Sequence, residues 1–255
     1  MPFWHHGYTC LSICVNDATK WPNFVPLDLD CFDEAVQFML LHPLVDTKQG
    51  IGVIGISTGA DVALHMACYN PQIKVCISIN SQSTYTWVAC KAMYKGKCIS
   101  AEPPNCDEAI MSAEGISMHG IYSGKHMGDP IPVEKSQAHF LLIHSCDDQT
   151  YHYSHALHLA DRLRQARGNN DDKCEVHVYP GAGHILFPPY VPLCRSGYNP
   201  FMGCPVLYGG DDRLHAVAQQ NAWQCILDFL SRHFDTNYKR IGRTDSENHK
   251  LVSKI

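Results

Sequence analysis

The feature that most constrains the fold is a repeated alternation of short apolar runs with stretches of helical periodicity. Apolar runs bounded by turn residues predict strands at residues 11–15, 51–56, 73–79, 139–145 and 174–179. Apolar side chains at helical spacing predict helices at residues 28–41, 58–69, 151–166 and 213–234. Strands that alternate with helices form a mostly parallel sheet, because each helix carries the chain back to the start of the next strand. We therefore expect an α/β fold with helices on both faces of the sheet.

The chain has the length and hydrophobic content of one such domain. It has 255 residues, and 45% of them are hydrophobic, which suffices for one sizeable core. We assign residues 1–234 to the domain and residues 235–255 to a polar tail. Residues 81–136 interrupt the alternation and are rich in Gly, Pro and Ser. This insertion either covers the strand ends where ligands bind in such folds, or forms a surface excursion without a catalytic role.

Charge and composition exclude several classes of function. The formal net charge of −5 gives no long-range attraction for nucleic acid, so neither DNA nor RNA is an expected partner. The sixteen histidines are spread along the chain rather than clustered with metal-ligand spacing, so no metal is expected. The apolar run at residues 11–15 is shorter than the roughly 18 residues that a membrane span needs. We expect a soluble intracellular protein without stable membrane insertion.

The cysteines indicate thiols rather than a disulfide framework. Thirteen is an odd number, the sequence has no CxxC pair, and many cysteines stand in apolar runs such as Val75-Cys76-Ile77. We expect these cysteines to be reduced and buried.

The segment Gly55-Ile56-Ser57-Thr58-Gly59 matches the nucleophile elbow, in which a serine stands on a sharp turn between a strand and a helix. The predicted strand at 51–56 and the predicted helix at 58–69 supply that context, which favours a nucleophile at Ser57 over a structural Gly-Ser turn. We expect both glycines to be needed, because larger side chains would collide with the neighbouring strand and helix.

Two further positions supply the partners that a serine nucleophile requires. A serine hydroxyl attacks once an imidazole accepts its proton, and the imidazole needs a carboxylate to fix its tautomer. Asp147 and Asp148 follow one predicted strand, and His184 follows the next. The carboxyl ends of parallel strands meet at one edge of a sheet, which is also where Ser57 lies. The sequence therefore predicts His184 as the base and Asp147 or Asp148 as the acid.

The oxyanion of an acyl-transfer intermediate needs two N–H donors. One is expected from the backbone of Thr58, directly after the nucleophile. The second normally comes from a loop after an earlier strand, and residues 11–15 are the first recognisable strand. We expect the strand that carries Ser57 to be central with the strand at 11–15 beside it. The first strands of the fold have no place in the chain, so we expect it to be less stable and less active than an extended form.

Longer motifs accompany the elbow along the chain. They include Phe32-Asp33-Glu34-Ala35 with Leu41-His42-Pro43, Ile79-Asn80, Tyr179-Pro180-Gly181-Ala182-Gly183-His184, Pro188-Pro189-Tyr190-Val191-Pro192-Leu193-Cys194, Gly209-Gly210 and Ala222-Trp223. Together, over residues 11–234, they resemble the C-terminal catalytic domain shared by acyl-CoA thioesterases and bile acid-CoA:amino acid N-acyltransferase. The resemblance implies an α/β-hydrolase fold that lacks its first strands. It places nucleophile, acid and base at Ser57, Asp148 and His184, and so favours Asp148 over Asp147.

The resemblance also implies a reaction. Family thioesterases carry serine at the nucleophile and the amidating enzyme carries cysteine, so Ser57 implies hydrolysis of fatty acyl-CoA to free fatty acid and coenzyme A through an acyl-serine intermediate. The coenzyme A thioester is the substrate, and no cofactor is expected. Three alternatives remain: acyl transfer to an amine such as glycine or taurine, carboxylic-ester hydrolysis, and a truncated non-catalytic remnant that binds a ligand or partner. The sequence leaves acyl chain length and oligomeric state open.

The last three residues, Ser253-Lys254-Ile255, resemble the Ser-Lys-Leu address of peroxisomal proteins, with Ile in place of Leu. We therefore expect the protein in the peroxisome or the cytosol.

Overall fold

A central sheet of four parallel strands organises the molecule. The computed structural model describes residues 3–13, 26–86, 91–100, 106–122, 128–168, 173–199 and 203–234. The strand order is β2-β3-β8-β9. These strands are β2 (Ile51–Ile56), β3 (Ile73–Ile79), β8 (His139–Ser145) and β9 (Cys174–Tyr179), all paired in parallel. The parallel pairing confirms the α/β class, and the bounds agree with those expected from the apolar runs.

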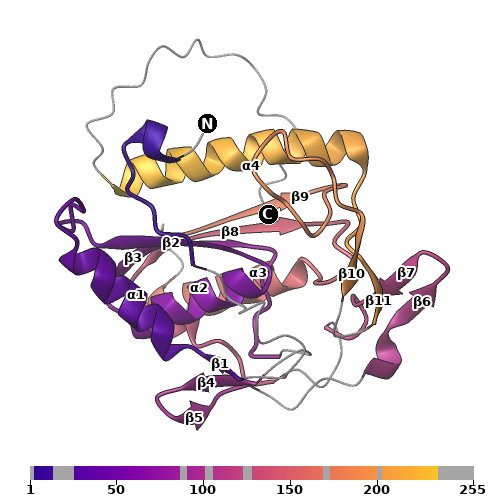
Figure 1. Ribbon diagram of the computed structural model, residues 1–255, viewed down its shortest axis with the longest axis horizontal. Coiled ribbons are helices and arrows are strands. Elements are labelled where there is room, and N and C mark those ends of the chain that lie inside the picture. The colour runs from indigo at the N-terminus through magenta and orange to yellow at the C-terminus, as the bar shows by residue number, and fades with distance from the viewer. Residues whose placement is uncertain are drawn as a thin grey trace.

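Helices cover both faces of this sheet (Figure 1). On one face lie α1 (Asp30–Leu41), α2 (Thr58–Tyr69) and α3 (Ser154–Arg167), and on the other lies α4 (Asp212–His233). All four helices were predicted, with shifts at their ends. The start of α3 lies three residues later than expected, because the N–H groups of Thr150 and Tyr151 bind the carboxylate of Asp148 instead.

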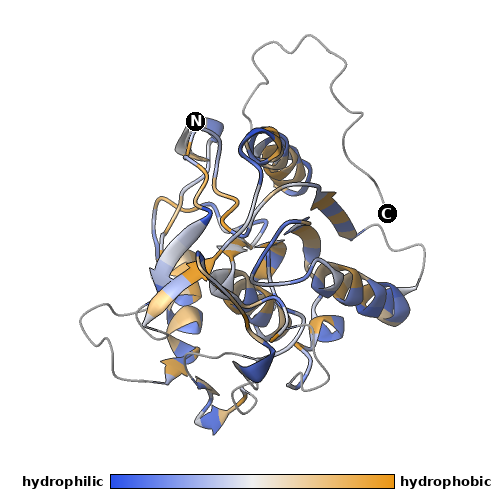
Figure 2. Ribbon diagram, turned by 90° about the vertical axis from the view of Figure 1, so that its right-hand side faces the viewer, coloured by the Kyte–Doolittle hydropathy of each residue, from blue (hydrophilic) through white to orange (hydrophobic). Residues whose placement is uncertain are grey.

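The alternation of side chains along the strands divides the core into two hydrophobic clusters. Cys76, Phe140 and Leu142 pack against α1, α2 and α3, whereas Ile77 and Leu141 pack against α4. The hydrophobic residues of the strands lie at the centre of the molecule, between helices that carry both hydrophobic and hydrophilic residues (Figure 2). Strands β3 and β8 are buried on both faces, which explains their long apolar runs in the sequence, whereas the outer strands β2 and β9 are only partly buried.

Short strands and 3-10 helices make up the rest of the described chain. The insertion contains β4 (Ala92–Tyr94), β5 (Lys97–Cys98), β6 (Ile110–Ser112) and β7 (Gly115–Ser117). Strand β1 (Leu27–Asp28) pairs with β4, and β7 pairs with β11 (Cys204–Leu207), which pairs with β10 (Ser196–Asn199). The 3-10 helices are η1 (Phe3–His6), η3 (Cys106–Glu108) and η4 (Val133–Lys135).

Part of the insertion packs against the segment that follows β8. Met118, Ile121 and Tyr122 form a third hydrophobic cluster with Tyr151 and Val206. These contacts favour the covering role over a free surface excursion for this part of the insertion.

Two expectations about the sheet are wrong. Leu11 and Ile13 are not in a strand, and their side chains are 43% and 40% exposed; residues 14 and 15 lie outside the described residues. Within the described segments β2 pairs only with β3, so it is an edge strand rather than a central one. A short apolar run does not specify a strand by itself, because strand preference depends on the neighbours that the side chains meet.

The expectation of buried cysteines holds for few of them. Ten cysteines in the described residues are free thiols, and of these ten only Cys68 and Cys76 are buried. Cys10 and Cys146 lie in loops and Cys31 lies on the outer side of α1, and all three are exposed.

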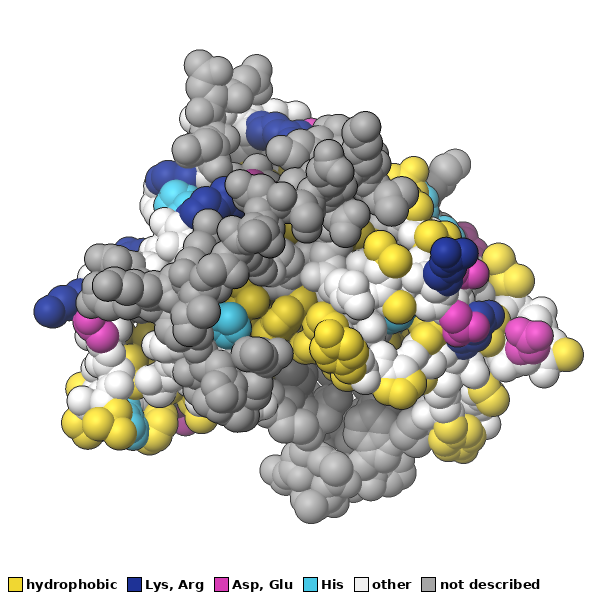
Figure 3. Space-filling view, turned by 90° about the horizontal axis from the view of Figure 1, so that it is seen from above, with side chains coloured by type: hydrophobic (Ala, Val, Ile, Leu, Met, Phe, Trp, Pro, Cys, Tyr) yellow, Lys and Arg dark blue, Asp and Glu magenta, His cyan; other side chains and the backbone are white. Residues whose placement is uncertain are grey.

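Positive and negative side chains are mixed on the surface of the molecule. On the face shown in Figure 3, Lys and Arg side chains lie apart from one another, and several stand beside Asp or Glu. Arg195 pairs with Asp212 at 2.9 Å, and Arg232 pairs with Glu175 at 2.7 Å.

Among the described residues, no helix has both the length and the apolar character that crossing a membrane requires. The polar tail at 235–255 lies outside the described residues.

Candidate active site

Ser57 lies on the turn between β2 and α2. Its backbone has φ 57° and ψ −131°, a conformation that is strained for a residue other than glycine. The N–H of Ser57 donates to the carbonyl of Ile79 at 2.9 Å, and α2 begins at Thr58. This strand–turn–helix geometry is that of the nucleophile elbow in α/β hydrolases.

The two glycines of the elbow differ in what surrounds them. A Cβ on Gly55 would lie 2.0 Å from the carbonyl oxygen of Gly59, closer than any real contact. A Cβ on Gly59 would meet no atom within 4 Å beyond its own helix and chain neighbours. The expectation that both glycines are needed is right for Gly55 and wrong for Gly59, because the α2 backbone crowds only the strand side of the turn.

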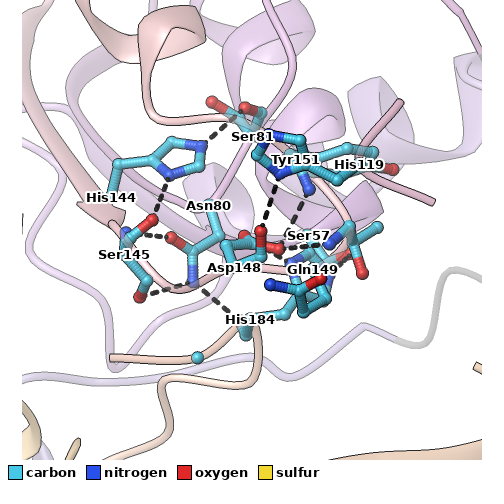
Figure 4. A network of polar contacts seen from close by, with 12 residues as sticks. Ser57, Asn80, Ser81, His119, His144, Ser145, Asp148, Gln149, Tyr151 and His184 are labelled. Atoms are coloured by element: carbon cyan, nitrogen blue, oxygen red, sulfur yellow. Dashed lines mark hydrogen bonds and ion pairs between the residues drawn. The ribbon is translucent and has the colours of Figure 1, made fainter. Parts of the chain in front are cut away.

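Ser57, His184 and Asp148 form one hydrogen-bonded chain (Figure 4). The Oγ of Ser57 lies 2.7 Å from Nε2 of His184, and Nδ1 of His184 lies 2.8 Å from Oδ2 of Asp148. His184 and Asp148 are 2% and 1% exposed, while Ser57 is half-buried. In this arrangement the imidazole is placed to accept the serine proton, and the carboxylate holds the N–H on Nδ1.

The structure distinguishes the two neighbouring aspartates. Oδ1 of Asp148 accepts hydrogen bonds from the N–H groups of Thr150 at 2.7 Å and Tyr151 at 2.9 Å, which leaves Oδ2 for His184. Oδ2 of Asp147 instead accepts the N–H of Gly210 at 2.9 Å. Asp148, and not Asp147, therefore meets the imidazole.

The loop that carries His184 is held by several groups. The N–H of His184 donates to the carbonyl of Tyr208 at 2.7 Å, and the N–H of Gly183 donates to Nδ1 of His215 at 3.1 Å. Burial lowers the pKa of His215, which keeps that ring neutral and its Nδ1 able to accept. The imidazole of His184 stands between the rings of Tyr151 and Tyr208, at centroid distances of 5.2 and 5.8 Å.

Neutral groups surround the imidazole and carboxylate. Burial raises the pKa of Tyr151 well above its ordinary value, so its phenol stays protonated. Burial lowers the pKa of His144, whose ring nitrogens lie 3.3 Å from the carbonyls of Ser81 and Ser145. Nδ1 of His119, from the insertion, donates to the backbone carbonyl of Asp148 at 3.0 Å. The insertion is thus hydrogen-bonded to the residue that meets His184.

The backbone of Thr58 is placed to stabilise negative charge. Thr58 is the first residue of α2, and the first N–H groups of a helix have no acceptor within the helix. They carry the positive end of the helix dipole, which favours an anion at that point. Among the described residues, no group of three or more His, Cys, Asp or Glu is placed to hold a metal ion.

Sequence reasoning missed four residues that contact this site. Asn80 follows β3 at the same edge of the sheet as Ser57, so its position could have identified it. Tyr151, Tyr208 and His215 contact His184 or its neighbour Gly183 through tertiary packing, and no local pattern marks them.

Comparison with known proteins identifies relatives over most of the chain. Acyl-coenzyme A thioesterase 3 of Mus musculus is 30% identical over 241 residues, which are 92% of this chain and 55% of that protein. Acyl-coenzyme A amino acid N-acyltransferase 1 of Mus musculus is 33% identical over 236 residues, 89% of this chain and 54% of that protein. Peroxisomal succinyl-coenzyme A thioesterase of Mus musculus is 30% identical over 241 residues, 92% of this chain and 56% of that protein.

The chain spans about half the length of these relatives. Residues 27–236 match the family described as "BAAT / Acyl-CoA thioester hydrolase C terminal". This match covers β1 through α4 and includes Ser57, Asp148 and His184. The chain belongs to the BAAT / acyl-CoA thioester hydrolase C-terminal family.

Proposed function

We propose that this chain is an acyl-CoA thioesterase that transfers the acyl group first to Ser57 and then to water. The observation that carries the proposal is the 2.7 Å contact between Ser57 Oγ and Nε2 of His184, whose Nδ1 meets Asp148 at 2.8 Å. Membership of the family supports an acyl-CoA substrate. The ordered contacts also favour an enzyme over a non-catalytic remnant.

The proposed first half-reaction forms the acyl-enzyme. Ser57 Oγ attacks the thioester carbonyl carbon while Nε2 of His184 takes the hydroxyl proton, and Asp148 stabilises the imidazolium that results. The N–H of Thr58 faces the oxyanion. When the C–S bond breaks, His184 returns the proton to the sulfur, and coenzyme A leaves as a thiol.

The second half-reaction releases the acid. A water molecule gives a proton to His184 and attacks the acyl-serine ester. Collapse of the intermediate returns the proton to Ser57 Oγ and yields the free carboxylic acid. Nucleophile, base and acid all belong to the chain, so the proposed reaction uses no cofactor.

Transfer to an amine is the second candidate, because the relatives include an N-acyltransferase as well as thioesterases. The serine nucleophile favours acyl transfer to water over transfer to an amine. An acyl-serine is an oxygen ester, which is less reactive toward amines than a thioester, so a serine nucleophile gives an amine less advantage over water.

A product assay tests the proposal. The purified chain is incubated with acyl-CoAs of several lengths, with and without glycine or taurine, and the thiol and the acyl products are measured. We expect free acid to remain the main product when the amino acid is present. We also expect Ser57→Ala to keep its circular dichroism spectrum and lose thiol release. An N-acyl amino acid as main product would establish the transferase, and unchanged thiol release in folded Ser57→Ala would exclude Ser57 as nucleophile.

We further propose that the protein is peroxisomal. The support is the sequence Ser253-Lys254-Ile255, which lies outside the described residues, and a relative that is named as peroxisomal. A fluorescent protein that ends in residues 237–255 should give a punctate peroxisomal signal, and the same fusion without the last three residues should not. A diffuse signal from both fusions would contradict the proposal.

A further inference from the structure

Asn80 is a buried amide that connects two of the segments in the candidate site. Its Nδ2 donates to the backbone carbonyl of His184 at 2.6 Å and to Oγ of Ser145 at 3.2 Å. Its Oδ1 accepts the N–H of Ser145 at 2.8 Å. Figure 4 shows the amide between Ser145 and His184. Asn80 has no exposed surface, so all these contacts are made away from solvent.

The backbone around Asn80 extends the connection to the nucleophile. The carbonyl of Ile79 accepts the N–H of Ser57 at 2.9 Å, and the N–H of Asn80 donates to the carbonyl of Ile143 at 2.9 Å. Two consecutive residues at the end of β3 therefore bind the backbone of the nucleophile on one side. On the other side they bind the end of β8 and the backbone of the base.

The geometry requires the chemistry of asparagine. The backbone of Asn80 has φ 52°, in the left-handed region that asparagine and glycine tolerate best. Its side chain supplies one acceptor and two donor hydrogens in a single plane. Aspartate has the same shape without the donors, and glycine accepts the backbone conformation without the side chain.

We propose that Asn80 is a positioning residue that holds the His184 backbone so that its imidazole stays aligned with Ser57. The proposal deepens the thioesterase function and rests on it. Without the amide, the buried carbonyl of His184 loses its donor, and the loop can relax away from the position that aligns Nε2 with Oγ. A displacement of about 1 Å at a reacting group costs about 100-fold in rate.

Variants at Asn80 separate positioning from general stability. Asn80→Asp keeps the shape, but its ionised carboxylate faces the His184 carbonyl with no hydrogen between them. Burial raises the pKa of that carboxyl, and its protonated form can donate to the carbonyl again. Asn80→Gly keeps the backbone conformation and removes the amide at every pH.

Asn70 offers a matched control. It is a buried asparagine at the C-terminal end of α2, and its Nδ2 donates to Oδ1 of Asp33 at 3.1 Å. Asn70→Asp introduces a buried carboxyl beside an acidic partner, so its ionisation lowers stability without touching the His184 loop.

The rate is measured against pH for each variant, per active site counted by titration with a serine-directed fluorophosphonate. Six titratable side chains lie near Asn80 and the His184 loop: Asp148, His144, Tyr151, Tyr208, His215 and His184 itself. Their titration contributes to every one of these pH profiles. These six side chains are present in wild type and in every variant. A fall in rate with rising pH that appears in one variant alone is therefore due to ionisation of the introduced carboxyl.

We expect Asn80→Asp to lower kcat about 100-fold at neutral pH with KM little changed. Its pH profile should also show a descending limb, in which kcat falls with rising pH as the introduced carboxyl ionises. Asn80→Gly should lower kcat by a similar factor with a profile of wild-type shape, and Asn70→Asp should keep both kcat and the wild-type shape. Wild-type kcat in both Asn80 variants overturns the proposal, and so does a descending limb in Asn70→Asp.

A second readout keeps this test separate from the proposed function. The Nδ1 proton of His184, hydrogen-bonded to Asp148, is observed by proton NMR in wild type and in each variant. If the wild-type chain releases no thiol from acyl-CoA, the thioesterase proposal fails, and this signal still tests Asn80. Its shift or loss in Asn80→Asp and Asn80→Gly, but not in Asn70→Asp, supports the positioning role. An unchanged signal in all three variants overturns it.

Discussion

At the residue scale, two adjacent carboxylates perform separate tasks. Asp148 binds Nδ1 of His184 and two backbone N–H groups, while Asp147 binds the N–H of Gly210. Gly210 lies just before α4, and the side chain of Asp211 caps the N-terminus of that helix. Asp147 therefore ties a loop to the site, and Asp148 orients the base.

This division predicts unequal effects of the same substitution. Asp148→Asn should lower kcat by about 10⁴-fold, because the amide favours the wrong imidazole tautomer. Asp147→Asn should cost less than about tenfold, since an amide oxygen can still accept the N–H of Gly210. Steady-state kinetics on both folded variants check this ranking, and a larger loss for Asp147→Asn would show that the acid is misassigned.

The residues of the site differ in how far the sequence could predict them. Ser57 directly follows one predicted strand and His184 lies in the loop after another, so their place at one edge of the sheet follows from strand order. The sequence pattern left Asp147 and Asp148 open, and family resemblance was needed to favour one. The contacts of Tyr208 and His215 with the His184 loop arise from tertiary packing, for which the sequence has no period or motif.

At the element scale, the turn between β2 and α2 depends on a single close approach. A Cβ at position 55 would lie 2.0 Å from the carbonyl oxygen of Gly59, and backbone atoms cannot move aside as a flexible side chain can. Gly59 lies inside α2, where its backbone needs no glycine.

Alanine substitutions should separate the two glycines. Gly55→Ala should lower the free energy of unfolding by about 3 kcal/mol or more and abolish activity, because overpacking forces the elbow apart. Gly59→Ala should leave activity intact and raise stability by up to about 1 kcal/mol, the helix preference of alanine over glycine. Urea denaturation measures both changes, and equal destabilisation by the two variants would contradict this reading of the turn.

Burial decides which elements the sequence predicts. Strands β3 and β8 are buried on both faces and carry long apolar runs that can be bounded from the sequence. The outer strands β2 and β9 are only partly buried, and their bounds follow from the turn residues beside them. Strands β6 and β10 are short and largely exposed, and their residues carry no periodic pattern. Residues 11–13 have the apolar composition of a strand without a pairing partner among the described residues, which is why that prediction was wrong.

At the scale of the whole molecule, two buried histidines make stability depend on pH. Burial lowers the pKa of both His65 and His155 to about 4. Nδ1 of His155 accepts the N–H of Ser83 at 3.1 Å, and its Nε2 donates to the carbonyl of Tyr122 at 2.9 Å. The folded state therefore keeps His155 neutral at pH values where the unfolded chain takes up a proton.

We expect the free energy of unfolding to fall as pH drops from about 6.5 toward 4. In this window the unfolded state binds more protons than the folded state, so each histidine lowers stability by at most about 3 kcal/mol. His155→Gln should flatten the dependence, and His158→Gln, an exposed residue of the same helix, should not. Denaturant titrations at pH 7 and 4.5 measure the difference, and an unchanged pH dependence in folded His155→Gln would contradict the assignment.

Direct detection of the acyl-enzyme tests the central claim most closely. The chain is mixed with excess fatty acyl-CoA and quenched in acid during the first turnovers, and its peptides are weighed by mass spectrometry. We predict that the peptide containing Ser57 gains the mass of the acyl group, and that the corresponding peptide of Ser57→Ala does not. Release of coenzyme A with the acyl group on a cysteine, or with equal turnover in Ser57→Ala, would contradict a serine nucleophile.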